Sequence, residues 1–464
     1  MAPGPSGAKA ASAEAELQKG NMTLAQTKDP HMSTGLLKVA ERARREPDAR
    51  FNSLAHLVDE AALGRAFHRI RKDAAVGVDG ITKEQYGQQL EENLRGLHER
   101  LRSMRYRHQP IRRVNIPKAQ GKTRPIGIST LEDKIVQGAL CEVLEAIYER
   151  DFLECSYGFR PKRSAHDALR AIGQMVSREG IAVILEADIQ AFFDSIDRKK
   201  LLELLQIRVA DPPFLRLIGK CLNVGVLDGG EFSRPEEGTA QGSSISPMFG
   251  NVYLHYVLDL WFERDIKPRL KGHTRLIRFA DDFVLGFEGQ DDAMRVLDVL
   301  HKRMSKYGLT MHPDKTRLIS FVRPRSGQND RSGPGTFNFL GFTMYWCRTR
   351  RGGWRLGMKT RKARIQRAVV TLGEWCRRHR HLSLKEQHAA LSRRLRGHYQ
   401  YFGVNGNSRS LRQVLHSTER RWLKWLRRRS QRGNRLTWER FVAYLKAHPL
   451  PPPRISVQIW ARAP

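Results

Sequence analysis

The stretch LIRFADDFVLGF, residues 276–287, places two adjacent aspartates between two apolar runs of strand-forming residues. These runs predict two antiparallel strands joined tightly at Ala280-Asp281-Asp282, with the carboxylates at the hairpin tip. Neighbouring carboxylates repel each other and lose solvation unless a cation neutralises them, and a hard divalent ion such as Mg²⁺ prefers oxygen ligands. An ordinary turn is the alternative, and Asp291-Asp292 is expected to be such a case, capping a helix.

A third carboxylate ends another predicted strand. The apolar run IAVILEADI, residues 181–189, reaches Asp188 at its end, and AFFDSID follows directly. Two strands that end in Asp188 and Asp281 would bring their carboxylates together around a pair of metal ions roughly 3.5–4 Å apart. In such a site one ion activates a primer 3′-hydroxyl and the other stabilises the leaving pyrophosphate, so the pattern predicts nucleotidyl transfer.

The charge of the chain is strongly positive and unevenly spread. The 464 residues hold 82 Lys and Arg against 48 Asp and Glu, a net charge of +34. Residues 351–464 alone contain 28 Lys and Arg but only 4 Glu. A field of this sign attracts polyanions, which favours a nucleic-acid partner over a merely solvated surface, since such surfaces usually mix both signs.

Cysteine usage and hydropathy exclude several classes. The five cysteines form no C-x-x-C pair, which argues against a disulfide framework or a zinc finger and favours a reducing compartment. No apolar run approaches the roughly 18 residues that a membrane helix requires, so we expect no membrane association. These features and the absence of a signal-peptide core predict a cytoplasmic protein.

The periodicity of apolar residues predicts an α+β fold. Strands and helices alternate up to about residue 357, with a basic β-hairpin over 111–128 and a long helix over 246–266. From Lys359 onward the pattern is helical and basic, and the expected helices are 360–380, 384–402, 407–429 and 437–447.

At this level of detail the sequence resembles the group II intron-encoded reverse transcriptases, also called maturases, from about Phe51 to Arg429. The resemblance rests on eight blocks in a fixed order: VGVDGIT, IPKAQGKTRPIGI, SYGFRPKRSAHDAL, ADIQAFFDSID, GTAQGSSISPMFGNVYL, RFADDFVLGF, GLTMHPDKT and FNFLGF. One short block arises easily by chance, but eight in sequence do not.

The resemblance implies a role for each acidic position. Asp188 and Asp281 would bind two catalytic Mg²⁺ ions, Asp282 would complete the acidic cluster, and the carbonyl of Ile189 would be a further ligand. The aromatic ring of Phe193 would pack under the sugar and exclude a 2′-hydroxyl, although a plain core phenylalanine is the alternative.

The same resemblance assigns the nucleotide contacts. Gln241 would approach the incoming nucleotide, and Lys118 and Arg124 on the basic hairpin would hold its triphosphate, since Arg suits bidentate phosphate contacts and Lys supplies a point charge. Two departures from the family pattern stand beside these positions. Phe279 replaces the usual Tyr, and Ala240 replaces the usual Pro, so a hydroxyl contact near the primer end is absent and the loop before Gln241 is freer.

Two basic segments would contact RNA in this reading. SYGFRPKRS, residues 156–164, supplies Arg160, Lys162 and Arg163, while its aromatic residues either contact template or pack the loop. RRWLKWLRRR, residues 420–429, supplies three exposed cations after an apolar i, i+3, i+4 pattern that faces a core. These three cations are Arg427, Arg428 and Arg429.

The expected architecture is a right-hand polymerase fold, α+β, with fingers, a palm that carries an antiparallel sheet, and a basic helical thumb or maturase domain. The expected divisions are a disordered leader (1–35), an N-terminal extension with the start of the fingers (36–110), fingers (111–180), palm (181–357), thumb (358–430), and a short basic C-terminal appendage that binds DNA in one reading (431–464).

The predicted function is RNA-directed DNA synthesis on group II intron RNA, with dNTPs, a DNA primer or target and two Mg²⁺ ions, serving splicing and retrohoming. The residues after Arg429 hold no His/Cys cluster of an HNH endonuclease, so the type without an endonuclease is expected. Two alternatives stay open: an RNA-binding splicing cofactor whose polymerase is dispensable, and a domesticated relative in DNA repair or phage defence. The cognate RNA and the choice between monomer and dimer stay open as well.

Overall fold

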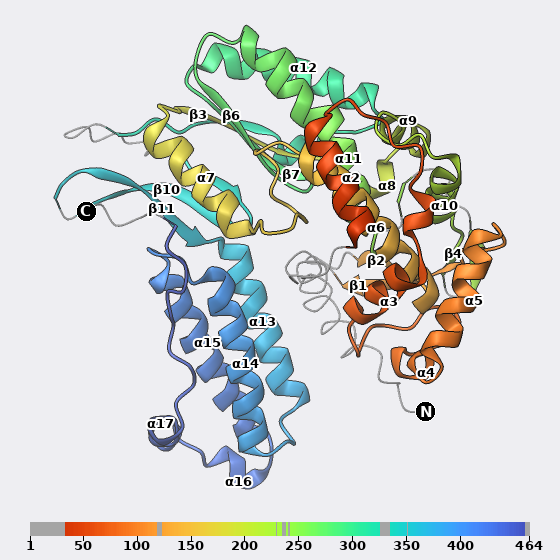
Figure 1. Ribbon diagram of the computed structural model, residues 1–464. Helices are drawn as coiled ribbons and strands as arrows, with labels where there is room; N and C mark the ends of the chain where they lie inside the picture. Colours follow the sequence, from red (N-terminus) through yellow and green to blue (C-terminus); the bar gives the residue numbers. More distant parts are fainter. Residues whose placement is uncertain are drawn as a thin grey trace.

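The computed structural model describes residues 33–117, 123–228, 230–233, 238–239, 242–324, 335–349 and 351–459. Its centre is a four-stranded antiparallel sheet with the order β6-β7-β3-β8 (Figure 1). These strands are β3 (Val183–Asp188), β6 (Thr274–Phe279), β7 (Asp282–Phe287) and β8 (Arg317–Ser320). The continuous apolar run in β3 is typical of an interior strand, and β3 indeed pairs on both sides.

Both faces of this central sheet are covered. Alternate β3 residues, Leu185 among them, join one core cluster with helix α12 (Gln290–Lys306). The intervening Ile184 joins a second cluster with helix α7 (Ala165–Arg178) and with a smaller sheet of order β11-β10-β9. The strands of that sheet are β9 (Phe337–Phe339), β10 (Phe342–Arg348) and β11 (Trp354–Thr360).

The region before β3 is mainly helical and packs around α6 (Leu131–Asp151), which is buried along most of its length. Its other helices are α2 (Thr34–Arg45), α3 (Glu60–Arg69), α4 (Lys83–Gly87) and α5 (Leu90–Arg102). The predicted basic hairpin over 111–128 is confirmed and forms a small sheet of order β2-β1-β4-β5. Its strands are β1 (Ile111–Pro117), β2 (Thr123–Ile128), β4 (Val226–Asp228) and β5 (Glu231–Ser233).

The helix predicted over 246–266 is confirmed in its extent, whereas the helix-capping role predicted for Asp291-Asp292 was wrong. The helix expected over 246–266 begins as α11 (Ser246–Leu254) and then widens into π-helical turns over His255–Asp259 and Trp261–Ile266. The aspartates expected to cap α12 lie inside its first turn, because Gly289 occupies the N-cap. Asp292 instead accepts backbone N–H bonds from Lys271 and Gly272.

Three helices lie between β3 and β4 in the sequence: α8 (Phe192–Ser195), α9 (Arg198–Gln206) and α10 (Pro212–Leu222).

The C-terminal region is a helical unit with its own core, as the sequence predicts. It consists of α13 (Lys362–Arg378), α14 (Leu384–Phe402), α15 (Ser408–Arg427), α16 (Gln431–Asn434) and α17 (Trp438–Ala447). Trp422 and Leu426 are buried in this core and Trp425 packs against it, so the expected apolar face of α15 is confirmed.

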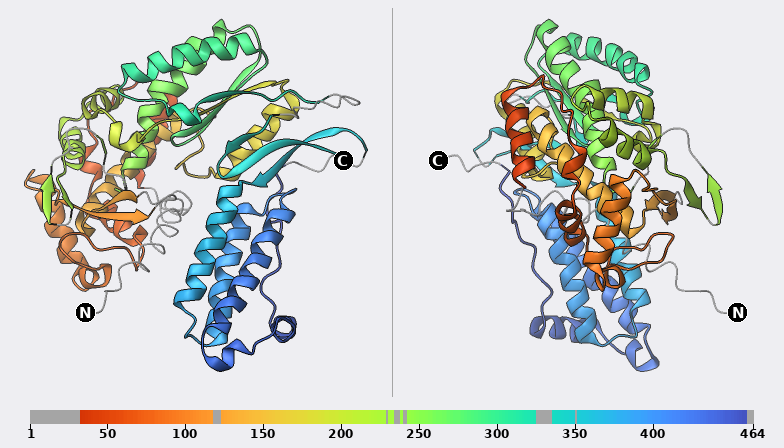
Figure 2. Two further views of the ribbon diagram at one scale, coloured as in Figure 1. Left: turned by 180° about the vertical axis from the view of Figure 1, so that it is seen from behind. Right: turned by 45° about the vertical axis from the view of Figure 1, so that its right-hand side comes forward.

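Residues 431–459 pack as part of this helical unit and of the body beneath it. Phe441 and Leu450 share the core of α14 and α15, and the chain then extends back toward the central sheet. There Val457 pairs with Val404, and Ile459 enters the core cluster beneath α7. Seen from behind, the helical unit and the N-terminal helices form two lobes on the same side of the central sheet (Figure 2).

Candidate active site

The paired aspartates lie at a tight hairpin turn, as predicted. Strands β6 and β7 pair with Phe279 opposite Asp282, which leaves Ala280 and Asp281 as a two-residue loop. Ala280 has φ 56, a left-handed conformation of the kind that primed hairpin turns require. The two carboxylates therefore lie at the point where the buried strands of the hairpin end.

The ladder between β3 and β7 brings the third carboxylate to the same place. Asp188 lies directly opposite Asp282 in this register. Residues opposite each other in an antiparallel pair have Cβ atoms about 4.5–5.5 Å apart and point to the same face. Asp188 and Asp282 are thus cross-strand neighbours, with Asp281 adjacent in the turn. The Asp281-Asp282 pair therefore meets Asp188, which is distant from it in the sequence, at one end of the two central strands, here called the acidic edge.

Burial and the closeness of these carboxylates change the pKa of Asp282. Burial, followed by the negative charges of Asp281 and Asp188, raises the pKa of the Asp282 carboxyl to about 8. A hydrogen bond with the backbone of Leu340, at the β9–β10 turn, acts in the opposite direction. A cation at this edge would relieve the repulsion, since an opposite charge stabilises the ionised carboxylate.

Lys315 is a member of this cluster that the sequence reasoning did not assign. Its ammonium lies 2.5 Å from Oδ2 of Asp188. The preceding His312 donates its backbone N–H to the Asp188 carbonyl at 2.8 Å, which folds the segment against the end of β3. The block GLTMHPDKT contains this lysine, but nothing in the sequence indicates that it lies beside Asp188.

The donor set fits magnesium by its chemistry, because carboxylate oxygens are the ligands that this ion prefers. The arrangement is not a ready-made cage. In the part of the chain that the structure describes, no three His, Cys, Asp or Glu side chains are grouped to hold a metal ion. Asp188 instead has the Lys315 ammonium as its cation, so a metal ion would compete with Lys315 for this carboxylate.

Ile189 follows Asp188 directly in the sequence, and Phe193 lies four residues further on. Ile189 is buried and forms an isolated β-bridge with Met311. The two hydrogen bonds of this bridge join residues that flank Ile189 and Met311, so neither of them uses the Ile189 carbonyl. Phe193, on α8, is half-buried and lies edge-on to Phe192 at a ring separation of 5.1 Å. Both readings of Phe193, as sugar platform and as core residue, are compatible with this partial exposure.

The expected nucleotide contacts are described only in part. Lys118 and Gln241 lie outside the described residues. The backbone of Arg124 pairs with Ile116 in the β1–β2 hairpin, and its side chain is likewise outside the description.

The expected RNA contacts in SYGFRPKRS differ from one another. Arg160 is buried, and its guanidinium donates to the Glu149 carboxylate and to backbone carbonyls of 153 and 156. We therefore correct its assignment from RNA contact to internal brace. Arg163 donates to Glu154 at 2.6 Å, whereas Lys162 is exposed.

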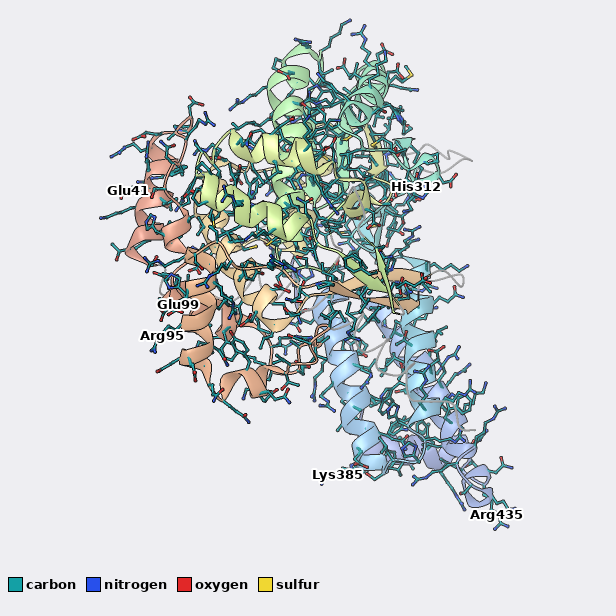
Figure 3. The ribbon with its side chains drawn as sticks, turned by 90° about the vertical axis from the view of Figure 1, so that its right-hand side faces the viewer. Glu41, Arg95, Glu99, His312, Lys385 and Arg435 are labelled. Atoms are coloured by element: carbon teal, nitrogen blue, oxygen red, sulfur yellow. The ribbon has the colours of Figure 1, made fainter. Side chains whose placement is uncertain are left out.

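The three arginines at the end of α15 are all exposed. Arg427 donates to the Leu436 carbonyl, Arg429 donates to the His381 carbonyl, and Arg428 lies over the Trp425 ring. Figure 3 labels Lys385 and Arg435 at the outer end of this helical unit, and His312 on the body of the molecule beside the central sheet.

A family model described as reverse transcriptase (RNA-dependent DNA polymerase) matches residues 116–344, which include every strand of the central sheet and all three aspartates. This match places the chain in the class of RNA-directed DNA polymerases. No helix in the described part of the chain has the length and apolarity needed to cross a bilayer.

Similar individual proteins indicate which group of RNA-directed DNA polymerases the chain resembles. Protein YkfC of Escherichia coli strain K12 is 32% identical over 73% of this chain and 95% of its own length. The group II intron-encoded protein LtrA of Lactococcus lactis is 31% identical over 56% of this chain and 45% of its own length. An uncharacterized 91 kDa protein in a cob intron of Schizosaccharomyces pombe is 45% identical over 33% of this chain and 19% of its own. The chain belongs to the group II intron-encoded reverse transcriptases, or maturases.

Proposed function

We propose that the protein copies group II intron RNA into DNA at the edge formed by Asp188, Asp281 and Asp282, and that it binds the same RNA to assist splicing and retrohoming. The observation that carries the proposal is the β3–β7 register, which sets Asp188 opposite Asp282 beside the turn that holds Asp281. Carboxylates that meet at the end of two central strands suit a reaction that depends on positioning and charge neutralisation.

Asp188, Asp281 and Asp282, with the Ile189 carbonyl, would hold two Mg²⁺ ions. When bound, these ions would lower the pKa of a primer 3′-hydroxyl and neutralise charge on the leaving pyrophosphate. In this proposal Lys118, Arg124 and Gln241 hold the incoming dNTP, and the Phe193 ring lies under its sugar.

The proposed architecture is a right hand in which residues 36–110 lead into the fingers (111–180), residues 181–357 form the palm, and residues 358–430 form the thumb. The two lobes on one side of the central sheet support this division (Figure 2). Residues 431–459 pack with the helical unit, so we assign them to the thumb instead of a separate appendage. The proposed RNA contacts are the exposed cations Lys162, Arg427, Arg428 and Arg429, together with the partly exposed Arg163.

Primer extension on an RNA template with Mg²⁺ tests the proposal. Asp281→Ala should lower the rate by at least about 100- to 1000-fold, because it removes a group that stabilises charge in the transition state. RNA affinity should stay at the wild-type value. The matched control is Asp291→Ala, which removes an exposed aspartate from the other Asp-Asp pair and should retain the wild-type rate. Extension by Asp281→Ala at the wild-type rate would refute the assignment.

The same assay separates the rival function. A wild-type protein that binds intron RNA and promotes splicing, yet extends no primer under any divalent ion, would be a splicing cofactor without polymerase activity.

A further inference from the structure

A buried polar network lies directly behind the acidic turn, and its centre is Arg278 on β6. The Arg278 side chain has no solvent exposure, and neither has that of its partner Asp259. Arg278 donates to both Asp259 oxygens, from Nε at 2.8 Å and from Nη2 at 2.6 Å. This is the bidentate geometry in which the planar guanidinium matches a carboxylate.

The remaining donors of Arg278 reach other segments. Nη1 donates to the Asn251 side-chain oxygen and to the Ala280 carbonyl, each at 3.0 Å. Nη2 also donates to the Ser156 hydroxyl at 2.8 Å. A guanidinium has five N–H donors, and these five bonds account for all of them. One of the acceptors, the Ala280 carbonyl, belongs to the two-residue turn itself.

The acceptors come from segments that also contact the turn through their backbones. Asn251 donates its side-chain amide to the Gly158 carbonyl at 2.8 Å. A Cβ atom placed on Gly158 would lie 2.3 Å from the Ala280 nitrogen, so only glycine fits here. The backbone on either side of Ser156 exchanges two 2.8 Å hydrogen bonds with Arg278. The loop before α7 is thereby held against the hairpin tip.

The helical segment that supplies Asp259 is itself unusual. Asp259 ends the π-helical turn His255–Asp259 that interrupts the helix begun at Ser246. Short π-helical stretches inside α-helices are rare and occur often at functional sites. The same helix provides Asn251, so two of its residues meet one guanidinium.

A buried ion pair is weak evidence for a gain in stability, because desolvation offsets much of the attraction between the charges. A guanidinium that uses all five N–H donors is better explained by the fixed positions that it imposes on its partners than by a gain in stability. We propose that Arg278, with Asp259 and Asn251, is a positioning group that fixes the Ala280-Asp281 turn so that the Asp281 carboxylate meets Asp188. This inference rests on the proposed function for its catalytic consequence.

Arg278→Lys is the primary test, because lysine keeps the charge and can pair with Asp259 but has no planar fork to reach Ala280 and Asn251 at once. The expected result is a fall of about 100-fold in the single-turnover rate at saturating dNTP, since small misplacements of reacting groups cost that much. The affinity for primer–template should be unchanged, and a higher Mg²⁺ concentration should be needed for the half-maximal rate.

Hydrogen exchange supplies a readout independent of activity. Amide exchange in the segment 276–287 should become faster in Arg278→Lys, since the turn loses its anchor. The matched control is Arg208→Lys. Arg208 is also buried and pairs with Asp151, but its other hydrogen-bond partners are the carbonyls of 43, 46, 47 and 49 in the N-terminal region. It should lower thermal stability and leave both the rate and the exchange of 276–287 at wild-type values.

The outcomes separate this inference from the proposed function. Wild-type rate and exchange in Arg278→Lys, or losses no larger than those of Arg208→Lys, would overturn the positioning role. If Arg278→Lys does not fold, Asn251→Ala decides by the same two readouts, since it leaves the Arg278–Asp259 pair intact. If the wild type extends no primer, the proposed function fails, while faster exchange of 276–287 in the variant still supports the positioning of the turn.

Discussion

The acidic edge and the basic helical unit are built on opposite principles. At the edge, the backbone register of three strands sets which carboxylates meet, so we expect each of the three positions to be individually required. In the region 351–464, 28 Lys and Arg are distributed over several helices, and no single charge fixes the surface. The comparison predicts that single substitutions abolish function at the first site and only weaken it at the second.

The largest difference is expected for Asp282→Asn, which has the shape of the protonated aspartic acid but cannot ionise. Because burial and neighbouring charge raise the pKa of Asp282 to about 8, the neutral form is readily populated without a cation. If the ionised form is needed, the extension rate should fall by about 100-fold. The exposed Asp314→Asn should show no loss. A wild-type rate in Asp282→Asn would mean that its charge has no role.

A smaller effect is expected at Phe193, which carries no charge and follows Asp188 by five residues in the sequence. Phe193→Ala should reduce discrimination against ribonucleotides by about tenfold or more, because a contact that rejects one added hydroxyl is worth about 1–3 kcal/mol. The measurement is the ratio of kcat/KM for dNTP and rNTP. Phe192→Leu, at the adjacent buried ring, is the control that should keep the wild-type ratio. An unaltered ratio in Phe193→Ala would make Phe193 a core residue.

The smallest effect is expected on the basic side. Replacement of Arg427, Arg428 and Arg429 by Gln should leave the rate at saturating template unchanged and should flatten the salt dependence of RNA binding. Each phosphate that the protein no longer neutralises reduces the slope of log K against log salt by about 0.7, so three phosphates give about 2. Titrations at several salt concentrations measure this slope. An unchanged slope would show that these side chains do not meet phosphates.

The sequence predicted the elements of the acidic edge because they are local. Apolar runs that stop at Asp188 and on either side of Asp281 mark strand ends, and a two-residue turn forces the pairing of β6 with β7. The apolar face of α15 around Trp422 followed from helical spacing in the same way.

Long-range partners were not predictable by those means. Arg278 meets Ser156, Asn251 and Asp259 only after four segments have packed together, and the π-helical turn that precedes Asp259 has no periodic signature. Arg160 illustrates the same limit, since a cation in a basic loop gave no sign that Glu149 would bury it. The pairing of Lys315 with Asp188 also depends on tertiary packing.

In the proposed mechanism, Asp188 and Asp281 act as one catalytic unit. Single-turnover extension rates of Asp188→Glu, Asp281→Glu and the double variant test it, because the retained carboxylates keep the rates measurable. Residues that act as a unit show strongly non-additive losses, so the double variant should be no slower than the slower single variant within a few-fold. A double variant whose loss of rate equals the product of the two single losses would contradict a shared site. So would a wild-type rate in both Asp188→Glu and Asp188→Ala, measured separately.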